Sequence, residues 1–335
     1  MESRPAAPRH ELCVVAPAFN EEANLERFWS EVSSALAPLD VDYAFLFVDD
    51  GSRDRTPQVL AALRARDPRV RWIRLARNFG LQSALTAGLA HSDGDATVIM
   101  DADLQDDPNA LAAMVAEWRA GADVVYAVRT SRREHVVKRA LFAIFHRMMA
   151  AMAEVPVPRD AGSFALYSRR VVDHINALPE RNRYLPGLRA WVGFRQVGIP
   201  VARRERHAGR PAQSLHRLVS LALDGILSFS KAPLRVASLL GVTVTLLSFG
   251  GLLVVAYWRF IQRSFPSGVG QATIALALFF LGGVQLLVLG AVGEYLGRVY
   301  DEVKRRPNYI VSDWCGEPMS EMPAHAAVEG GRDEL

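Results

Sequence analysis

The sequence contains little cysteine, with only Cys13 and Cys315 among its 335 residues. Two cysteines cannot build a disulfide framework or a four-ligand structural zinc site. Charge of one sign is not in excess, because 39 Lys and Arg stand against 36 Asp and Glu, for a formal net charge of +3. The 24 glycines and 18 prolines are near average usage, which excludes a collagen-like or low-complexity chain. Composition therefore indicates a globular protein and no nucleic-acid partner.

The N-terminal segment, residues 1–11, lacks the apolar core of a signal peptide. We expect it to be flexible and the domain that follows to stay in the cytoplasm. Two nucleotide-binding motifs are also missing. No Gly-x-Gly-x-x-Gly follows the first apolar run, and no Gly-x-x-x-x-Gly-Lys-Ser/Thr occurs in the chain. The sequence therefore predicts neither a nicotinamide dinucleotide site nor a P-loop.

Two long stretches without a charged residue lie in the second half of the chain, at 236–258 and 264–293. At about 1.5 Å of rise per residue, each is long enough as a helix to cross the ~30 Å hydrocarbon core of a bilayer. A pair of buried core helices is the alternative, but helices of soluble proteins rarely stay uncharged over such a length. We therefore expect two transmembrane helices, at 235–259 and 270–296.

Basic residues around these stretches indicate how the chain crosses the membrane. Seven lie outside the helix pair and two lie in the loop between the helices. An excess of Lys and Arg marks the cytoplasmic side. We therefore expect a cytoplasmic domain at 12–212 and a cytoplasmic tail at 297–335, poorly ordered after Val311. The outer residues are Arg217, Lys231, Arg235, Arg298, Lys304, Arg305 and Arg306, and the loop holds Arg259 and Arg263.

Residues 213–231 carry apolar side chains at helical spacing, with polar and basic side chains between them. The pattern predicts an amphipathic juxtamembrane helix in the membrane interface, with its basic residues near the lipid phosphates. A helix packed on its own domain is the alternative. Both arrangements hold the domain close to the bilayer. The apolar positions are Leu215, Leu218, Val219, Ala222, Ile226 and Phe229.

Short apolar runs alternate with helical patterns before residue 130. Continuous apolar strands separated by helices predict a parallel, doubly wound α/β sheet. Ligands of such sheets bind beyond the carboxyl ends of the strands. The expected strands are Leu12–Ala16, Tyr43–Val48, Val70–Leu75, Ala96–Met100 and Val124–Val128, and the expected helices are Glu22–Leu39, Thr56–Arg66, Leu81–Ala90 and Asn109–Ala120.

Acidic side chains follow three of the first four expected strands, in Pro17–Glu21, Asp49–Ser52 and Asp101–Gln105. Carboxylates that converge on one edge repel unless a cation or a hydrogen-bonding ligand joins them. Asp101 and Asp103 can share one hard cation, with water and substrate phosphates in its remaining positions. The pair therefore predicts a divalent metal site.

Turn chemistry offers an alternative for these segments, because Asp residues often cap helices or close turns. The segment Asp49–Ser52 fits a turn followed by a helix cap. The functional interpretation is that a carboxylate of this segment accepts hydrogen bonds from the base or ribose of a nucleotide. Both interpretations stay open at this point.

Together with Arg77–Gly80, these segments resemble the inverting family 2 glycosyltransferases with the GT-A fold. Later motifs narrow the resemblance to the membrane-anchored polyprenyl-phosphate glycosyltransferases, similar to bactoprenol glucosyltransferases and dolichol-phosphate mannose synthase. The resemblance extends from Leu12 to Val311. It implies a GT-A domain with a mostly parallel sheet, followed by the interfacial helix and the two-helix hairpin. The later motifs are Asp160–Phe164, Tyr184–Arg189, Arg206–Gly209 and Gly293–Arg298.

The resemblance also implies roles for individual residues. Asp160, Arg206 and Asp103 are the implied catalytic residues, with Arg206 on the donor phosphates and Asp160 either a weak base or a group that positions sugar hydroxyls. The family usually has Ser-Lys where this chain has Arg210-Pro211, and we expect Arg210 to supply the missing charge. The implied metal ligands for Mg²⁺ or Mn²⁺ are Asp101, Asp103 and Gln105, the nucleotide pocket is Pro17, Phe19, Glu21, Val48, Asp50 and Ala102, and the acceptor-phosphate pair is Arg129 and Arg139.

The implied reaction is inverting transfer of a sugar from a nucleotide sugar to polyprenyl (undecaprenyl) phosphate. It would take place at the cytoplasmic face of the inner membrane and give a polyprenyl-phosphate monosaccharide for cell-envelope glycan or lipid modification. UDP-glucose is the favoured donor. The alternatives are a GDP-mannose-dependent mannose synthase and a transferase of a UDP-amino sugar or of 4-formamido-arabinose.

Two further classes of protein are disfavoured. A processive polysaccharide synthase would carry a Gln-x-x-Arg-Trp motif, which is missing. A flippase or carrier subunit without chemistry would not need the intact Asp101-x-Asp103 motif. A homo-oligomer is compatible with the sequence.

Overall fold

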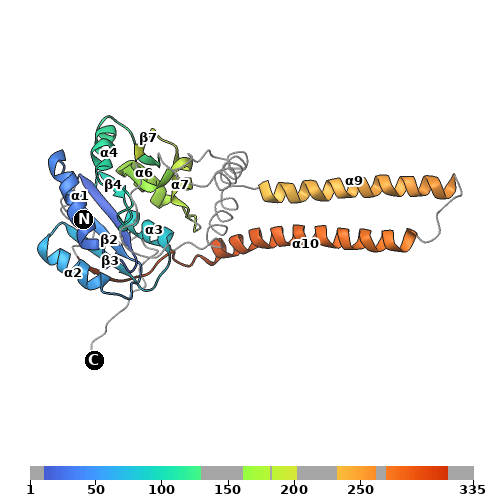
Figure 1. Cartoon of the computed structure of the whole chain (residues 1–335), viewed down its shortest axis with the longest axis horizontal. Coiled ribbons are helices and arrows are strands. Elements are labelled where there is room, and N and C mark those ends of the chain that lie inside the picture. The colour runs from blue at the N-terminus through green and yellow to red at the C-terminus, as the bar shows by residue number, and fades with distance from the viewer. Residues whose placement is uncertain (1–10, 130–160, 182, 202–231, 262–268, 316–335) are drawn as a thin grey trace, which may run out of the picture. The chain divides into compact units, whose positions relative to one another are not determined.

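The computed structural model divides the chain into two compact units (Figure 1). The first unit contains the β-sheet and comprises residues 1–150, 155–219 and 306–335, and the second comprises 151–154 and 220–305. The residues that the structure describes are 11–129, 161–181, 183–201, 232–261 and 269–315.

Several predicted features lie outside the described residues. These are the flexible N-terminus up to residue 10, the juxtamembrane helix at 213–231, and the site residues Arg139, Asp160 and Arg206. They stay predictions.

An eight-stranded sheet forms the framework of the first unit, in the order β7-β5-β6-β4-β1-β2-β3-β8. Strand β1 pairs in parallel with β2 and β4, β2 with β3, and β5 with β7. Strand β6 runs antiparallel between β4 and β5, and β8 runs antiparallel to β3. The predicted mostly parallel α/β sheet is confirmed. The strands are β1 Leu12–Ala18, β2 Tyr43–Asp49, β3 Val70–Leu75, β4 Ala96–Ile99, β5 Val124–Arg129, β6 Ala161–Ser168, β7 Gln196–Val201 and β8 Val311–Cys315.

Strands β1 and β2 are buried at all seven positions of each. Successive side chains of a strand point to opposite faces, so a strand between two layers of helices needs apolar residues at nearly every position. The run of apolar residues in β2 ends at Asp49, which is the first polar side chain at the carboxyl edge of that strand.

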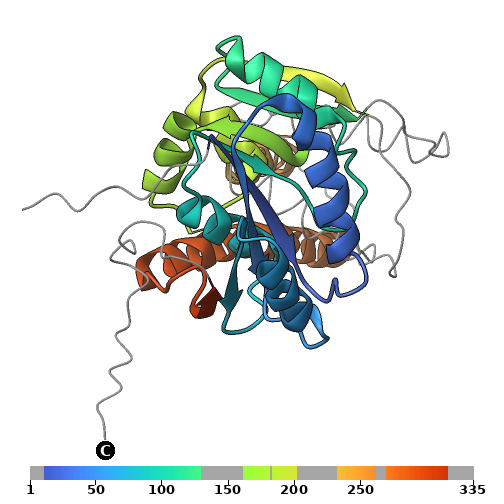
Figure 2. The same ribbon diagram turned by 90° about the vertical axis from the view of Figure 1, so that its left-hand side faces the viewer.

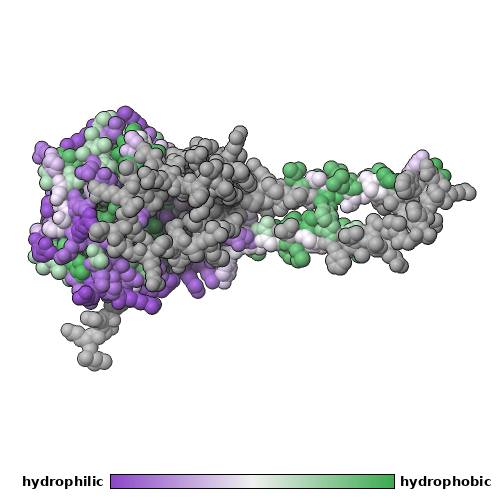
Figure 3. All heavy atoms as spheres, viewed as in Figure 1, coloured by the Kyte–Doolittle hydropathy of each residue, from purple (hydrophilic) through white to green (hydrophobic). Residues whose placement is uncertain are grey.

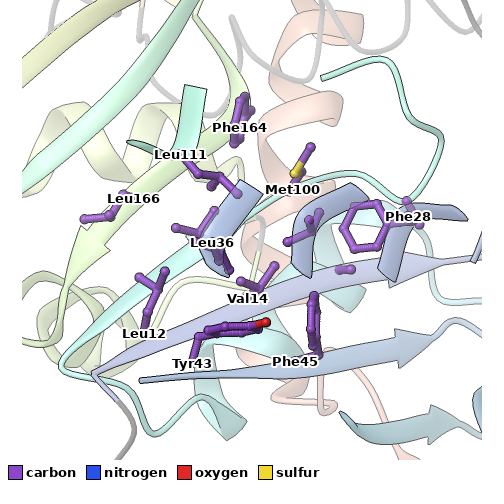
Figure 4. Packing of buried hydrophobic residues seen from close by; sticks show 14 of the residues in the cluster. Leu12, Val14, Phe28, Leu36, Tyr43, Phe45, Met100, Leu111, Phe164 and Leu166 are labelled. Atoms are coloured by element: carbon purple, nitrogen blue, oxygen red, sulfur yellow. The ribbon is translucent and has the colours of Figure 1, made fainter. Parts of the chain in front are cut away.

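Helices cover both faces of the sheet (Figure 2). On one face, Phe28 of α1 and Met114 of α4 join a core with Val14 and Phe45, and Figure 4 shows Phe28 in this layer. On the other face, α3 packs on β1 and β2, and α6 and α7 pack on β6. The helices are α1 Leu25–Leu36, the 3-10 turn η1 Ala37–Leu39, α2 Thr56–Arg66, α3 Leu81–His91, α4 Ala110–Arg119, α6 Arg169–Ala177 and α7 Leu185–Val192.

The C-terminal strand β8 corrects one expectation. We predicted a poorly ordered chain after Val311, but Val311–Cys315 pairs with β3 and closes that edge of the sheet. The pattern of β8 is mixed, and three of its five side chains are exposed. A strand this short is recognisable only from the edge with which it pairs, and for this reason the prediction was wrong for Val311–Cys315. Residues 316–335 lie outside the described residues.

The second unit contains two long helices that contact each other, α9 Ala232–Phe260 and α10 Val269–Lys304. Helix α10 continues beyond the expected end of the second span at 296. Many apolar side chains of these helices are exposed, for example Leu247 at 71% and Leu286 at 72% (Figure 3).

Within the described residues, one helical segment is long and apolar enough to cross a membrane. It is Phe280–Lys304, with 25 residues and a mean hydropathy of 1.4. A second apolar stretch, Gly241–Gly251, is shorter. The predicted hairpin of two transmembrane helices therefore stays a prediction.

Candidate active site

The predicted site segments converge on one edge of the sheet. Parallel strands end at the same edge, so the residues after β1, β2, β3 and β4 lie side by side there. Strand β6 is antiparallel and therefore begins at this edge. Its register pairs Ala165 with Ile99, which brings Ser163 next to the residues that follow β4. The hydroxyl of Ser163 donates to Oδ2 of Asp101 at 3.5 Å.

The turn after β4 presents the predicted metal ligands. Ala102 and Leu104 are buried at 2% and 3% exposure, whereas Asp101, Asp103 and Gln105 are only partly buried. Buried apolar residues therefore alternate with partly buried polar ones, and the apolar side chains anchor the turn. The backbone N–H of Gln105 donates to Oδ1 of Asp103 at 3.1 Å, which orients that carboxylate.

The donor set of this turn fits a hard divalent cation. Two carboxylates and one amide oxygen within five residues are ligands that Mg²⁺ and Mn²⁺ accept, and both ions keep positions for water or phosphate oxygens. No cluster of three or more His, Cys, Asp or Glu side chains with metal-binding geometry occurs in the described part of the chain. A cation at this turn would therefore need oxygen atoms from water or substrate as well.

The loops after β1 and β2 are joined by reciprocal hydrogen bonds. The N–H of Asn20 donates to Oγ of Ser52, and the N–H of Arg53 donates to Oδ1 of Asn20, both at 2.9 Å. The N–H of Glu21 donates to Oγ1 of Thr56 at 3.0 Å. These bonds fix the loop in which Phe19 is 43% exposed and Glu21 is partly buried.

Asp49 is fully buried and holds the turn after β2. Its Oδ1 accepts the N–H of Ser52 at 2.9 Å, and its Oδ2 pairs with Nε of Arg74 at 3.2 Å. Arg74 also donates through Nη2 to the carbonyl of Ser52 at 3.0 Å. The turn interpretation of this segment is therefore correct for Asp49.

Asp50 joins the loop after β2 to the loop after β3. Its Oδ1 accepts the N–H of Phe79 at 2.7 Å and its Oδ2 accepts the N–H of Gly80 at 2.9 Å. Burial raises the pKa of Asp50, and the two N–H groups oppose that rise. The carboxylate thus fixes the two residues directly before α3, whose N-cap Gly80 has no side chain to accept a hydrogen bond.

Gly51 permits these two loops to touch. Its φ is +68°, and a Cβ placed there would lie 2.5 Å from the carbonyl carbon of Arg77 and 2.7 Å from the amide nitrogen of Asn78. A side chain at this position would push the loops apart. The segments Asp49–Ser52 and Arg77–Gly80 are called the rim below.

The structure brings most of the predicted nucleotide residues together. Pro17 and Val48 are direct neighbours in the register of β1 and β2, and both are buried. Arg129 ends β5 at the same edge, opposite Val201 of β7. Ala161, the residue directly after Asp160, begins β6 at the same edge. The roles assigned to these residues stay predictions.

Sequence reasoning missed three contributors to this edge: Ser163, Arg74 and the N–H groups of Phe79 and Gly80. Ser163 stands in a motif that we quoted, but nothing in the sequence indicates that it reaches Asp101. A usable signal existed for Phe79 and Gly80. The helix that begins at Leu81 lacks a capping Ser, Thr, Asp or Asn, and so requires a partner from elsewhere.

Comparisons of the sequence with known proteins show the family of this chain. The family model described as glycosyl transferase family 2 matches residues 13–175. An uncharacterized glycosyltransferase of Synechocystis sp. is 43% identical over 91% of this chain and 96% of its own length. The bactoprenol glucosyl transferase of Shigella phage SfII is 38% identical over 90% of this chain and 97% of its own length.

Among solved structures, one glycosyltransferase is similar to this chain at low identity. The mannosyltransferase PcManGT from Pyrobaculum calidifontis, in complex with GDP-Man and Mn²⁺, is 18% identical with a TM-score of 0.43, over 88% of this chain and 90% of that one. The full-length similarity to glycosyltransferases is much stronger. The chain therefore belongs to glycosyl transferase family 2.

Proposed function

We propose that this protein transfers a sugar, with inversion, from a nucleotide sugar to polyprenyl phosphate at the cytoplasmic face of the membrane. UDP-glucose is the favoured donor. The observation that carries the proposal is the extent of the similarity to bactoprenol glucosyl transferases, which covers 90% of this chain at 38% identity. The match therefore includes part of the chain beyond residue 175, where the family model ends.

Asp101, Asp103 and Gln105 would hold Mg²⁺ or Mn²⁺ beside the donor diphosphate. When bound, such an ion supplies positive charge against the negative charge of the leaving diphosphate. The chain's own groups orient both carboxylates. The hydroxyl of Ser163 donates to the carboxylate of Asp101, and the backbone N–H of Gln105 donates to the carboxylate of Asp103.

The donor nucleotide would lie against the buried floor of Pro17 and Val48 and against the rim. Phe19 is exposed beside this floor and offers a ring surface. Asp50 is already hydrogen-bonded to two N–H groups, but each carboxylate oxygen can accept a second hydrogen bond. We propose Glu21 and Ala102 as further contacts of the nucleotide, and Arg206 as the contact of its phosphates.

The acceptor phosphate is ionised at neutral pH and needs positioning more than deprotonation. We assign this task to Arg129 and Arg139. An oxygen of the phosphate attacks the anomeric carbon, the bond from that carbon to the diphosphate oxygen breaks, and the nucleoside diphosphate leaves. During this step, Asp160 positions the sugar hydroxyls or acts as a weak base.

Membrane attachment fits a lipid acceptor. A polyprenyl phosphate stays in the bilayer, so its transferase must work at headgroup level. Among the described residues, Phe280–Lys304 of α10 is long and apolar enough to cross the membrane. We propose that α9, which also exposes many apolar side chains, crosses beside it. The amphipathic segment 213–231 would lie in the interface, with the sheet unit on the cytoplasmic side.

A donor panel tests the proposal. The purified full-length protein in lipid nanodiscs is incubated with undecaprenyl phosphate, Mn²⁺ or Mg²⁺, and labelled UDP-glucose, UDP-N-acetylglucosamine or GDP-mannose. The expected product is undecaprenyl phosphate with one glucose. Transfer from GDP-mannose alone would instead identify a mannose synthase, and a long polymer would identify a processive synthase. If no donor is bound or used, the transferase proposal is wrong.

A further inference from the structure

The chain re-enters the first unit directly after the apolar helix. Helix α10 ends at Lys304, and after residues 305–308 the side chain of Tyr309 is buried in the first unit at 8% exposure. Strand β8 follows from Val311. We call residues 309–315 the strap.

The strap holds the last residues of β3. The N–H of Ala76 donates to the carbonyl of Ile310 at 2.8 Å, and the hydroxyl of Ser312 donates to the carbonyl of Arg74 at 3.2 Å. The register pairs Leu75 with Val311. The strap therefore supports the backbone of β3 at the position where the strand leads into the rim.

Tyr309 anchors the beginning of the strap. Its hydroxyl lies 3.4 Å from Nε2 of His91, and the two rings meet edge-on at a centroid distance of 6.1 Å. Burial raises the pKa of Tyr309 to about 12 and lowers that of His91. At neutral pH the phenol is therefore protonated and the imidazole neutral, which allows the phenol to donate to His91. His91 ends α3, the helix whose start is held by Asp50.

Both halves of the rim depend on the same strand. The side chain of Arg74 binds Asp49 and the carbonyl of Ser52, which fixes the turn after β2. Ala76 directly precedes Arg77–Gly80, and in that segment the N–H groups of Phe79 and Gly80 bind Asp50. In the described part of the chain, the strap is the element that pairs with the outer edge of this strand.

We infer that the strap is a positioning element for the donor: it fixes the rim, so that tight nucleotide binding depends on the chain that follows the apolar helix. This inference rests on the proposed function, because it assigns the nucleotide to the rim. It also gives a role to a segment that lies outside the family match, which ends at residue 175.

Two truncations of the full chain in nanodiscs test the inference. One ends at Arg306 and lacks the strap, and its matched control ends at Cys315 and keeps it. The dissociation constants of UDP and GDP with Mn²⁺ are measured by calorimetry. We expect the control to bind like the full chain, and loss of the strap to weaken nucleotide binding about tenfold or more, the equivalent of ~1.4 kcal/mol.

A milder variant covers the case in which the shorter truncation does not fold. Tyr309→Phe combined with Ser312→Ala removes two hydroxyl hydrogen bonds and keeps the strand. We expect a rise of about threefold in the nucleotide dissociation constant, with the KM for undecaprenyl phosphate unchanged, because each such bond contributes modestly. Equal changes in donor and acceptor constants would indicate general destabilisation and overturn the inference.

Hydrogen exchange provides the local readout. Amides of 76–80 should exchange faster in both strap variants, whereas those of 124–129 in β5 should not change. Unchanged exchange at 76–80, or unchanged nucleotide binding in a folded strap variant, would refute the inference and leave the proposed function standing. A full-length protein that binds neither UDP nor GDP would refute both.

Discussion

Arg189 of α7 lies over the ring of Tyr126 of β5, with its guanidinium carbon 4.4 Å from the ring centroid. The side chain is fully buried. Its three nitrogens form no hydrogen bond of ordinary geometry with the described residues, although the buried hydroxyl of Tyr167 lies near enough to interact with the guanidinium, and no carboxylate of those residues pairs with it. Burying a charge without a counter-ion is costly, and stacking on one aromatic ring offsets only part of that cost.

Arg189→Met should therefore raise stability. Methionine keeps most of the buried volume and the contact with Tyr126 but removes the charge. We expect the free energy of unfolding to rise by ~1–2 kcal/mol, measured as a higher midpoint of thermal unfolding. Arg189→Ala is the matched comparison and should destabilise, because it leaves a cavity. A lower midpoint for the methionine variant would show that the cation itself is needed.

Asp103→Asn should abolish metal-dependent turnover while leaving membrane insertion intact. The substitution removes one negative oxygen from the proposed metal site but keeps the size of the side chain. We expect a loss of activity of about a hundredfold or more, together with weaker binding of Mn²⁺ in a direct titration. Asp107→Asn, in the same loop, is the control and should retain activity. Full turnover by the Asp103 variant would disprove the metal assignment.

Arg129→Ala should weaken use of the lipid acceptor more than binding of the nucleotide donor. Arg129 ends β5 at the site edge, five strands away from β3 in the sheet. We expect the KM for undecaprenyl phosphate to rise about tenfold or more, because a charge-assisted contact to phosphate is lost, with the dissociation constant of UDP nearly unchanged. Equal losses on both sides would contradict the acceptor role.

Gly51→Ala should open the rim. The new Cβ would meet the backbone of Arg77 at 2.5 Å, and the φ of +68° adds strain. Gly193→Ala is an informative control, because Gly193 lies outside the rim and also has a positive φ, but nothing lies within 4 Å of its Cβ position. We expect ~1 kcal/mol of destabilisation from strain in both variants and a further loss in nucleotide affinity only for Gly51→Ala. Calorimetry with UDP compares the two, and equal affinities would argue against the close contact.

His91 should make stability fall in acid. Burial lowers the pKa of His91 below its ordinary value of 6.5. The unfolded chain then binds a proton that the folded chain does not, so stability is fully present above pH 6.5 and is lost as the pH falls below it. We expect His91→Gln to flatten this dependence in thermal unfolding between about pH 7.5 and about pH 5. His174→Gln, at an exposed position, is the matched control.

The sequence predicted the sheet well because burial on both faces leaves a local mark. Strands β1, β2 and β4 are largely apolar runs, whereas β3 carries Arg71 and Arg74 between buried apolar residues, and each of the four was expected within about two residues of its observed bounds. The segment Asp101–Gln105 was placed correctly at the carboxyl edge for the same reason. Strand β6 was not predicted, since Ala161–Ser168 carries small and polar residues at the edge where the site lies.

By itself, then, the sequence determined which segments before residue 130 become strands and helices, and that carboxylates gather at one end of the sheet. Only the tertiary structure decided how those groups are used: Asp50 holds Phe79 and Gly80, Arg74 neutralises Asp49, and Ser312 reaches Arg74 across 238 residues. The physical reason is the distance along the chain over which each kind of information acts. Hydrophobic periodicity records the environment of a segment along its own length, whereas a hydrogen bond between distant segments forms only after the layers between them have packed.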